Sequence, residues 1–240
     1  MEVPDLGAKG RLLGYRHTTA DPPYLHEDYV ATRTRAPKRP LVPLVHTLSE
    51  ITGPVYGHER VGESDHDLTG QFEDEPLGER IVLHGTVTDG DRRPVPHTLI
   101  ELWQANAAGR YRHVVDRHPA PFDPNFAGAG RCVTDAEGRY RFVTIKPGAY
   151  PWRNHDNAWR AAHIHLSLFG PAFATRVVTQ MYFPGDPLFF QDPIFHSVRD
   201  PDARELMVSR FDLEETVPEW ALAYRFDIVL RGREGTPFEE

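Results

Sequence analysis

The sequence contains a single cysteine, Cys132, among its 240 residues. One thiol cannot form a disulfide within the chain, so the fold must be stable without covalent cross-links. Disulfides are typical of secreted proteins and rare in reducing compartments. The near absence of cysteine therefore favours a cytoplasmic protein.

Long apolar segments and targeting signals are also missing. No apolar run approaches the roughly 20 residues that span a bilayer. Residues 1–7 lack the basic segment and the apolar stretch that begin a secretory signal. We therefore expect no association with a membrane.

Clustered positive charge is absent as well. The chain has 27 Lys and Arg against 35 Asp and Glu, which gives a formal net charge of −8. Proteins that bind nucleic acids neutralise phosphates with clustered Lys and Arg. This composition argues against a nucleic-acid partner, but it does not indicate which small molecule could bind.

Proline and glycine, by contrast, are plentiful, with 22 and 19 residues. Their spread favours short strands joined by many turns. Residues 1–78 are predicted to form an irregular arm that packs on the core or on a partner subunit. Prolines interrupt this arm at 21–23, 36–40 and 53–54. Residues 79–240 are predicted to form a β-sandwich, with the whole chain a single structural domain.

The remaining chain has the alternation and the β-branched content of strands. Asp135–Gly138 is a turn sequence that predicts a hairpin between the strands on either side. Asp200 can cap a helix with Pro201 at its first position. We expect an all-β sandwich of short strands with long loops and one or two short helices. The predicted strands span 80–89, 98–103, 131–134, 139–143, 163–169, 176–183 and 223–230.

Two histidines on one predicted strand are the first candidate functional residues. His163 and His165 are two residues apart, so their rings project from the same face, while Ile164 and Leu166 face the other way. That geometry suits a metal, although an exposed strand could carry two histidines without one. A cupin would add a carboxylate after three or four intervening residues, where this chain has Phe169 and Gly170. A zinc hydrolase would need a further ligand, for which only His155 and Asp156 are nearby.

Two tyrosines in predicted loops are the second unusual feature. Tyr111 lies in Gly109-Arg-Tyr-Arg-His113, and Tyr150 lies in Pro147-Gly-Ala-Tyr-Pro-Trp152. Neither position belongs to a strand core, where packing would explain an aromatic ring. Ordinary loop aromatics remain the alternative explanation.

These segments, together with Trp159-Arg-Ala-Ala-His-Ile-His165, resemble the iron-binding segments of intradiol ring-cleaving dioxygenases. They occur in that family's order, with 39 residues from Tyr111 to Tyr150 and 13 from Tyr150 to His163. Glu101-Leu-Trp-Gln-Ala-Asn106 is similar to the family's core strand. The resemblance extends from about Asp28 onward, and it is strongest to the catalytic beta subunits that act on protocatechuate.

The resemblance implies Fe(III) bound by Tyr111, Tyr150, His163 and His165, with a hydroxide as fifth ligand. Fe(III) is a hard cation that favours anionic oxygen donors. A free phenol has a pKa of about 10, but a highly charged metal can remove its proton. Two tyrosinates and one hydroxide would balance the charge of the ion. The implied reaction joins O2 to a catechol and opens the ring between the two hydroxyl-bearing carbons, giving a cis,cis-muconate.

The resemblance also assigns roles to residues around the iron. Tyr150 is expected to leave the metal and take a catechol proton when substrate binds. Arg160 is expected to stabilise negative charge on the ring, although a surface salt bridge would be its ordinary role. Gln180 is expected to hydrogen-bond near the reacting carbons, and Trp152 to form a pocket wall.

The carboxylate of protocatechuate is expected to meet Tyr29 and Ile194. Tyr29 belongs to the arm, where it could instead anchor the arm on the sandwich. The resemblance further implies a homologous alpha subunit in a hetero-oligomer, with this chain as the catalytic partner.

Two alternative functions remain open at this point. One is intradiol cleavage of another catechol, such as hydroxyquinol. The other is a non-catalytic sandwich module of the transthyretin or carboxypeptidase-regulatory type. Such a module would have no reason to combine two loop tyrosines with His163 and His165.

Overall fold

A computed structural model describes residues 22–40, 57–169, 176–230 and 235–237 of the chain. Two stretches of the predicted arm, residues 1–21 and 41–56, lie outside the described residues. Within the described ranges, no helix is both long and apolar enough to cross a membrane.

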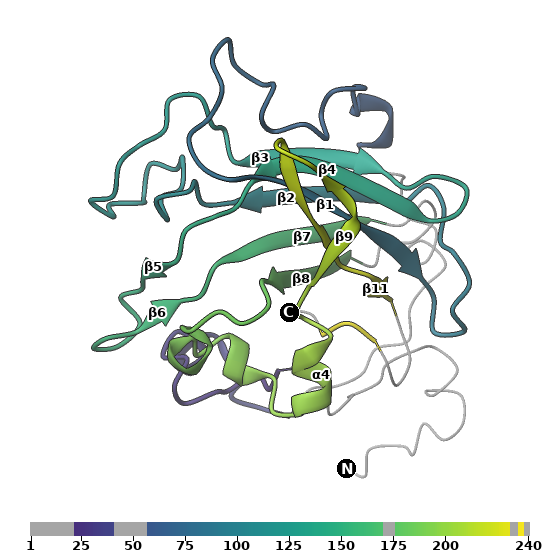
Figure 1. The fold of residues 1–240 in the computed structure, drawn as a ribbon. Helices are drawn as coiled ribbons and strands as arrows, with labels where there is room; N and C mark the ends of the chain where they lie inside the picture. The colour runs from purple at the N-terminus through teal and green to yellow at the C-terminus, as the bar shows by residue number, and fades with distance from the viewer. Residues whose placement is uncertain (1–21, 41–56, 170–175, 231–234, 238–240) are drawn as a thin grey trace.

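Two β-sheets pack face to face and form the predicted sandwich (Figure 1). The four-stranded sheet is antiparallel in the order β3-β2-β7-β8, and the five-stranded sheet is mixed because β1 pairs in parallel with β10 and β11. The strands of the first sheet are β2 (Leu99–Gln104), β3 (Ala129–Val133), β7 (His163–Phe169) and β8 (Arg176–Tyr182). Those of the second are β1 (Arg80–Thr88), β4 (Arg139–Ile145), β9 (Arg210–Val217), β10 (Ala221–Arg225) and β11 (Ile228–Val229).

Apolar side chains from both sheets share one core. Leu83 and Phe142 come from the five-stranded sheet, and Leu102, Ile164 and Leu166 from the four-stranded sheet. Each of the five is at most 1% exposed. Burying a side chain of this size stabilises a fold by about 1.5–3 kcal/mol, so the shared core holds the sheets together.

The predicted hairpin around residues 135–138 is wrong, although the turn itself forms. The Asp135 N–H donates to the Arg139 carbonyl at 3.0 Å, and the Asp135 side chain accepts the Glu137 N–H at 2.9 Å. Beyond the turn the strands part, because β3 pairs with β2 and β4 pairs with β1. The Gly138 carbonyl accepts the Val87 N–H at 2.8 Å, which directs β4 to the other sheet. The same turn sequence is compatible with a hairpin or with a corner between two sheets. The pairing of β3 with β2 and of β4 with β1 makes it a corner.

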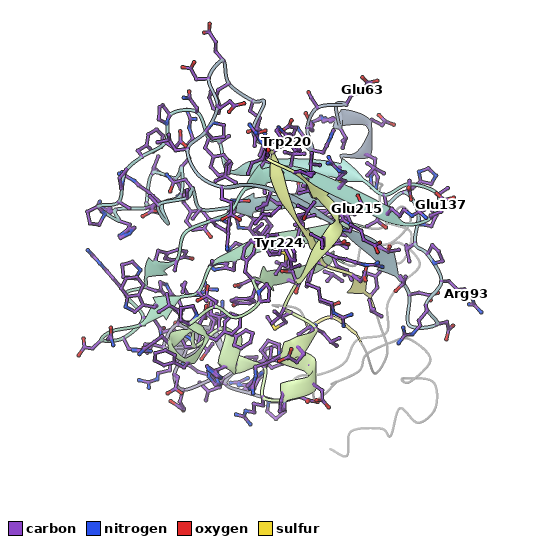
Figure 2. The ribbon with its side chains drawn as sticks, viewed as in Figure 1. Glu63, Arg93, Glu137, Glu215, Trp220 and Tyr224 are labelled. Atoms are coloured by element: carbon purple, nitrogen blue, oxygen red, sulfur yellow. The ribbon has the colours of Figure 1, made fainter. Side chains whose placement is uncertain are left out.

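The predicted strand 223–230 is interrupted, and the strand before it was missed. β10 ends at Arg225 and β11 begins at Ile228. In between, the Asp227 carboxylate accepts the Thr86 N–H at 3.0 Å, so a side chain satisfies that donor of β1. β9 escaped prediction because its eight residues are mostly exposed and charged. Trp220 lies at the turn between β9 and β10, and Tyr224 lies on β10 (Figure 2).

Helices in the described residues are short. The predicted capped helix is α4 (Pro201–Glu205), and the Asp200 side chain accepts the Asp202 N–H as expected of an N-cap. The others are α2 (Thr32–Arg35) and three turns of 3-10 helix, η1 (His58–Arg60), η2 (Phe189–Gln191) and η3 (Phe195–Ser197).

A two-stranded ribbon, β5 (Tyr150–Pro151) and β6 (Trp159–Arg160), extends beside the four-stranded sheet (Figure 1). Residues 22–40 lie next to the segment that carries η2 and η3, below this ribbon (Figure 1). The Asn154 side chain of the ribbon donates to the Asp28 carbonyl at 2.6 Å. Described arm residues are thus attached beside the outer face of the four-stranded sheet.

We predict that Gly85→Ala destabilises the fold by about 3 kcal/mol, because core sites tolerate added volume poorly. Gly85 lies on β1 where the chain passes Phe226, and a Cβ there would overlap the Phe226 carbonyl oxygen. Denaturant unfolding of both proteins measures the loss. Gly70→Ala is the control, since its Cβ would meet no atom closer than 3.6 Å. Equal stability of the Gly85 variant and the parent would contradict this account.

Candidate active site

The outer face of the four-stranded sheet carries the two predicted histidines. Ile164 and Leu166 point into the core, so His163 and His165, which alternate with them on β7, point outward. Strand pairing sets Trp103 and Gln180 on either side of His165. The Trp103 ring stacks on the His165 ring with centroids 4.8 Å apart and the planes 4° from parallel.

A loop after β2 brings Tyr111 to this face. The Asn106 side chain accepts the N–H groups of Ala108 and Arg110 at 3.0 and 2.9 Å, which folds the loop back on itself. Gly109 has a φ of 79° and lies so close to the Ala149 carbonyl that a side chain would not fit. The loop of Tyr111 is therefore packed directly against the residue that precedes Tyr150.

The β5–β6 ribbon positions Tyr150. Tyr150 on β5 pairs with Arg160 on β6, three residues before His163. One short ribbon therefore delivers a phenol and a guanidinium to the same end of β7.

Two phenol oxygens and two imidazole nitrogens converge at this point. Tyr150 Oη lies 3.4 Å from His163 Nε2, and Tyr111 Oη lies 3.2 Å from His165 Nε2. The two tyrosine rings meet edge to face with centroids 5.6 Å apart, and the two histidine rings are 4.8 Å apart. The structure thus brings together all four residues that the resemblance singled out as metal ligands.

Burial keeps this cluster neutral in the absence of a cation. Burial raises the pKa of Tyr111 well above 10, and the neighbouring Tyr150 adds to the effect. Burial also raises the pKa of Tyr150, while Arg160 opposes the rise. Burial, together with the positive charge of Arg160, lowers the pKa of His163 well below 6.5 and that of His165 to about 3. The phenols therefore keep their protons, and the imidazoles offer lone pairs.

The donors of the cluster suit a metal ion. His163 Nδ1 lies 2.6 Å from the Ala161 carbonyl, which fixes the proton on Nδ1 and leaves Nε2 free to act as a ligand. Elsewhere in the described ranges, no three or more His, Cys, Asp and Glu side chains gather in a way that could bind a metal. A cation at this point would take its oxygen ligands from the two phenols, a preference typical of hard, highly charged ions.

Arg160 is buried in a network of its own. Its Nε donates to both carboxylate oxygens of Asp192, at 3.1 and 3.0 Å. Its Nη2 donates to Gln180 Oε1 and, at 3.3 Å, to the Tyr182 hydroxyl. Burial by itself would lower the pKa of Arg160, but Asp192 and the nearby phenols hold it well above its usual value. The guanidinium is a fixed positive charge beside the cluster.

Asp192 joins that network to the predicted pocket wall. Its carboxylate is fully buried and also accepts the N–H groups of Ala161, Ile194 and Phe195 at 2.9–3.2 Å. Ile194 is 5% exposed, so it faces the interior.

A column of two aromatic rings with a cation at each end leads from the surface toward the cluster. The exposed Arg35 guanidinium lies 4.5 Å from the centre of the Tyr29 ring. Tyr29 meets Trp152 edge to face at 5.1 Å, and Arg160 lies 5.5 Å from the Trp152 ring. Two residues were predicted to meet a substrate carboxylate. Tyr29 belongs to this column, and Ile194 is hydrogen-bonded through its N–H to Asp192.

Several residues of this site were missed by sequence reasoning. Trp103 was recognised only as part of a strand, although its register opposite His165 gives it a surface at the site. Tyr182 shares the face of Gln180, two residues along β8, and this spacing could have identified it. Asp192 and Arg35 lie in no motif, and the sequence carried no signal for either.

Comparisons with known proteins agree with this geometry. Residues 51–232 match a family model described as "Dioxygenase". Residues 17–47 match a second model, described as "Protocatechuate 3,4-dioxygenase beta subunit N terminal".

Individual relatives cover most of the chain. The protocatechuate 3,4-dioxygenase beta chain of Burkholderia cepacia is 58% identical over 230 residues, which are 95% of this chain and 97% of that one. The protocatechuate 3,4-dioxygenase alpha chain of Pseudomonas putida is 30% identical over 67% of this chain and 76% of its own length. Among solved structures, the dioxygenase domain of a dioxygenase carbohydrate-binding fusion from Streptomyces sp. SirexAA-E aligns with a TM-score of 0.51 and 25% identity. That alignment covers 70% of this chain and 87% of the domain.

We predict that Asp192→Asn lowers the free energy of unfolding by about 3–5 kcal/mol, because it leaves the Arg160 charge buried without a counter-ion. Arg160→Gln should cost a similar amount, and the double variant should lose clearly less than the sum of the two. Denaturant unfolding of the four proteins gives the coupling energy. Additive losses would show that the two side chains do not act as a pair.

The control for this cycle is Asp65→Asn. Arg131 and Asp65 also form a pair, with Nε and Oδ2 2.8 Å apart, but both side chains reach solvent. Partly exposed pairs contribute at most about 1 kcal/mol, so this variant should unfold almost like the parent.

Proposed function

Because this chain belongs to the intradiol ring-cleaving dioxygenase family, we propose that it is the catalytic beta subunit of an enzyme that cleaves protocatechuate with O2 to 3-carboxy-cis,cis-muconate. The convergence of two phenols and two imidazoles on one point supports this function most directly. The 58% identity to a beta chain that acts on protocatechuate supports the substrate. A transthyretin-like module is excluded by membership of the dioxygenase family.

We propose Fe(III) as the cofactor, with Tyr111, Tyr150, His163 and His165 as its ligands. When bound, ferric iron supplies the Lewis acidity that makes a catechol ring reactive toward O2. The protein contributes a rigid donor set, since two ligands lie on one strand and the loops of the other two pack against each other. Two phenolates also offset much of the charge of the ion, which suits a buried site.

Tyr150 is the residue we expect to move a proton. Its phenol has a raised pKa in the absence of a cation, so a Tyr150 phenolate released from a metal would bind a proton strongly. Tyr150 Oη is therefore suited to accept one of the two catechol protons when substrate binds. The backbone of Tyr111 is held in place, because its N–H donates to the Asp116 carboxylate at 2.7 Å.

Arg160 and Gln180 are placed to act on the ring of the substrate. Negative charge that builds up on a catechol ring is stabilised by a fixed cation, and Asp192 and Gln180 hold Arg160 in one orientation. The side-chain oxygen of Gln180 accepts from Arg160 and from Tyr182, which places the carboxamide beside the guanidinium. Trp152 would wall the pocket beneath Arg160.

The column of Arg35, Tyr29 and Trp152 is our proposed route and recognition site for the ring carboxylate, with Ile194 as the apolar wall. Arg35 brings a positive charge to the Tyr29 ring. A catechol without a carboxylate would gain nothing from that charge. This feature favours protocatechuate over hydroxyquinol, which lacks a carboxyl group.

We further propose a homologous alpha subunit as partner in a hetero-oligomer, because the relatives of this chain include both alpha and beta chains of protocatechuate 3,4-dioxygenase. The arm of residues 1–78 would pack on the core and on that partner, as the hydrogen bond from Asn154 to Asp28 illustrates for the core. A cytoplasmic location fits the single cysteine.

Visible absorption tests the cofactor and its ligands. We expect the enzyme, co-expressed with an alpha partner and loaded with Fe(III), to be coloured by tyrosinate-to-iron charge transfer. Anaerobic protocatechuate should shift the band, and Tyr111→Phe or Tyr150→Phe should shift or weaken it. Tyr224→Phe, a buried tyrosine of β10, should leave the spectrum unchanged. A protein that stays colourless after ferric reconstitution would rule out the iron site.

Kinetics with two substrates tests carboxylate recognition. We expect Arg35→Gln to raise KM for protocatechuate about threefold to tenfold with little change in kcat, since lost uniform binding acts on KM. KM for unsubstituted catechol should not change, and the effect should shrink at high salt because the charge is exposed. Arg33→Gln on the same helix is the control. Equal effects on both substrates would remove Arg35 from carboxylate recognition, and a faster reaction with hydroxyquinol would favour that substrate instead.

A further inference from the structure

A small cavity lies at the edge of β8, next to the candidate active site. It is partly open, so its empty volume of about 240 Å³ includes solvent space, and its interior has room for about one water-sized sphere. Its wall includes Gln180, Ile194, Val198 and Met207, together with Pro22 and Pro237. The elements around it are β8, η3 and the end of α4, which lie close together in Figure 1.

The cavity offers little to a water molecule. Ile194, Val198, Met207 and the two prolines contribute apolar atoms, and proline has no N–H to donate. The polar side chains of the wall already have partners within the protein. Thr179 Oγ1 donates to the Pro237 carbonyl at 2.6 Å, and Ser197 Oγ donates to the Ile194 carbonyl at 2.6 Å. A bound water needs two to four hydrogen-bond partners, so a wall that offers few of them suits a small apolar molecule better than an ordered water.

Two wall residues connect the cavity to the site. Gln180 pairs with His165 across the strands and accepts a hydrogen bond from Arg160. Ile194 donates its N–H to Asp192, the counter-ion of Arg160. The side chains of Gln180 and Ile194 therefore lie between a molecule in the cavity and the active site.

We propose that this cavity binds O2 and is its route of entry to the active site. The occupant must be small, neutral and apolar. Of the two substrates of a dioxygenase, O2 is the one with these properties. The catechol, with its hydroxyl and carboxylate groups, has its own approach along Arg35 and Tyr29. Separate approaches let O2 reach the ring while the catechol fills the pocket. The inference rests on the proposed function only in taking O2 as the second substrate.

Xenon binding tests the cavity independently of catalysis, because xenon is an apolar probe of similar size. A crystal of the full enzyme under xenon pressure should show xenon between Val198 and Met207. Val198→Phe, which fills the cavity, should abolish the xenon site. Ordered water in the cavity of the parent protein, or the absence of xenon there, would overturn the proposal. Xenon bound in a metal-free protein would support it even if the iron assignment failed.

Steady-state kinetics at varied O2 tests the route. We expect Val198→Phe to raise KM for O2 about tenfold while kcat at saturating O2 and KM for protocatechuate stay the same, because only access and binding of O2 are lost. Val198→Ala widens the cavity and should keep KM for O2 at or below the parent value. If Val198→Phe does not fold, Val198→Leu makes the same test with less added volume.

The matched control is Val208→Phe. Val208 adjoins Met207 in the chain and packs in the same apolar cluster, but it does not line the cavity. It should leave KM for O2 unchanged. A KM for O2 that is unaffected by Val198→Phe, or that rises equally in the control, would overturn the route.

Discussion

Alternation along β7 ties the stability of this protein to its chemistry. Ile164 and Leu166 are completely buried between the sheets, and the residues between and beside them carry the two imidazoles outward. Any slip of β7 by one residue would put both histidines into the core and both aliphatic side chains at the site. The apolar core therefore fixes the direction of the imidazoles at no separate cost. The segments that carry Tyr111 and Tyr150 then pack on the outer face of the four-stranded sheet, where the direction of both imidazoles is already fixed.

Electrostatics in the site follow from one buried ion pair. Arg160 and Asp192 are 4% and 0% exposed, and a charge this deep is tolerated only with its partner. Asp192 balances the guanidinium while leaving its Nη2 directed to Gln180 and Tyr182. Burial, and after it the positive charge of Arg160, disfavours a proton on either histidine. The imidazoles therefore stay in the form that can bind a metal, beside a guanidinium that Asp192 holds in place.

Sequence reasoning reached the features that are local or that repeat a family pattern. The strand with His163 and His165, the helix capped by Asp200 and the sandwich class were all predictable from short-range rules. The partner of Arg160 was not, because Asp192 lies 32 residues away in a segment without periodicity. The corner at Asp135 was mistaken for a hairpin because its local hydrogen bonds are the same in both. Strand β9 was missed because it is an exposed edge, where polar residues replace the alternation that reveals buried strands.

The central strand of the five-stranded sheet has a consequence for how the chain folds. β1 pairs in parallel with β10, and Ile81 and Leu222 meet across 222 − 81 = 141 residues. Contacts between such distant segments form late, because the loop between them must close first. On a ribosome, β1 emerges long before β10 exists, while β2, β3, β7 and β8 can already pair with one another. The sheet that carries the histidines can therefore assemble during synthesis, and β1 paired with β4 can cover part of its apolar inner face, but the cover is incomplete until the last strands are released. In that interval the nascent chain depends on protection from aggregation, which makes folding yield, rather than final stability, the property most sensitive to changes in β10.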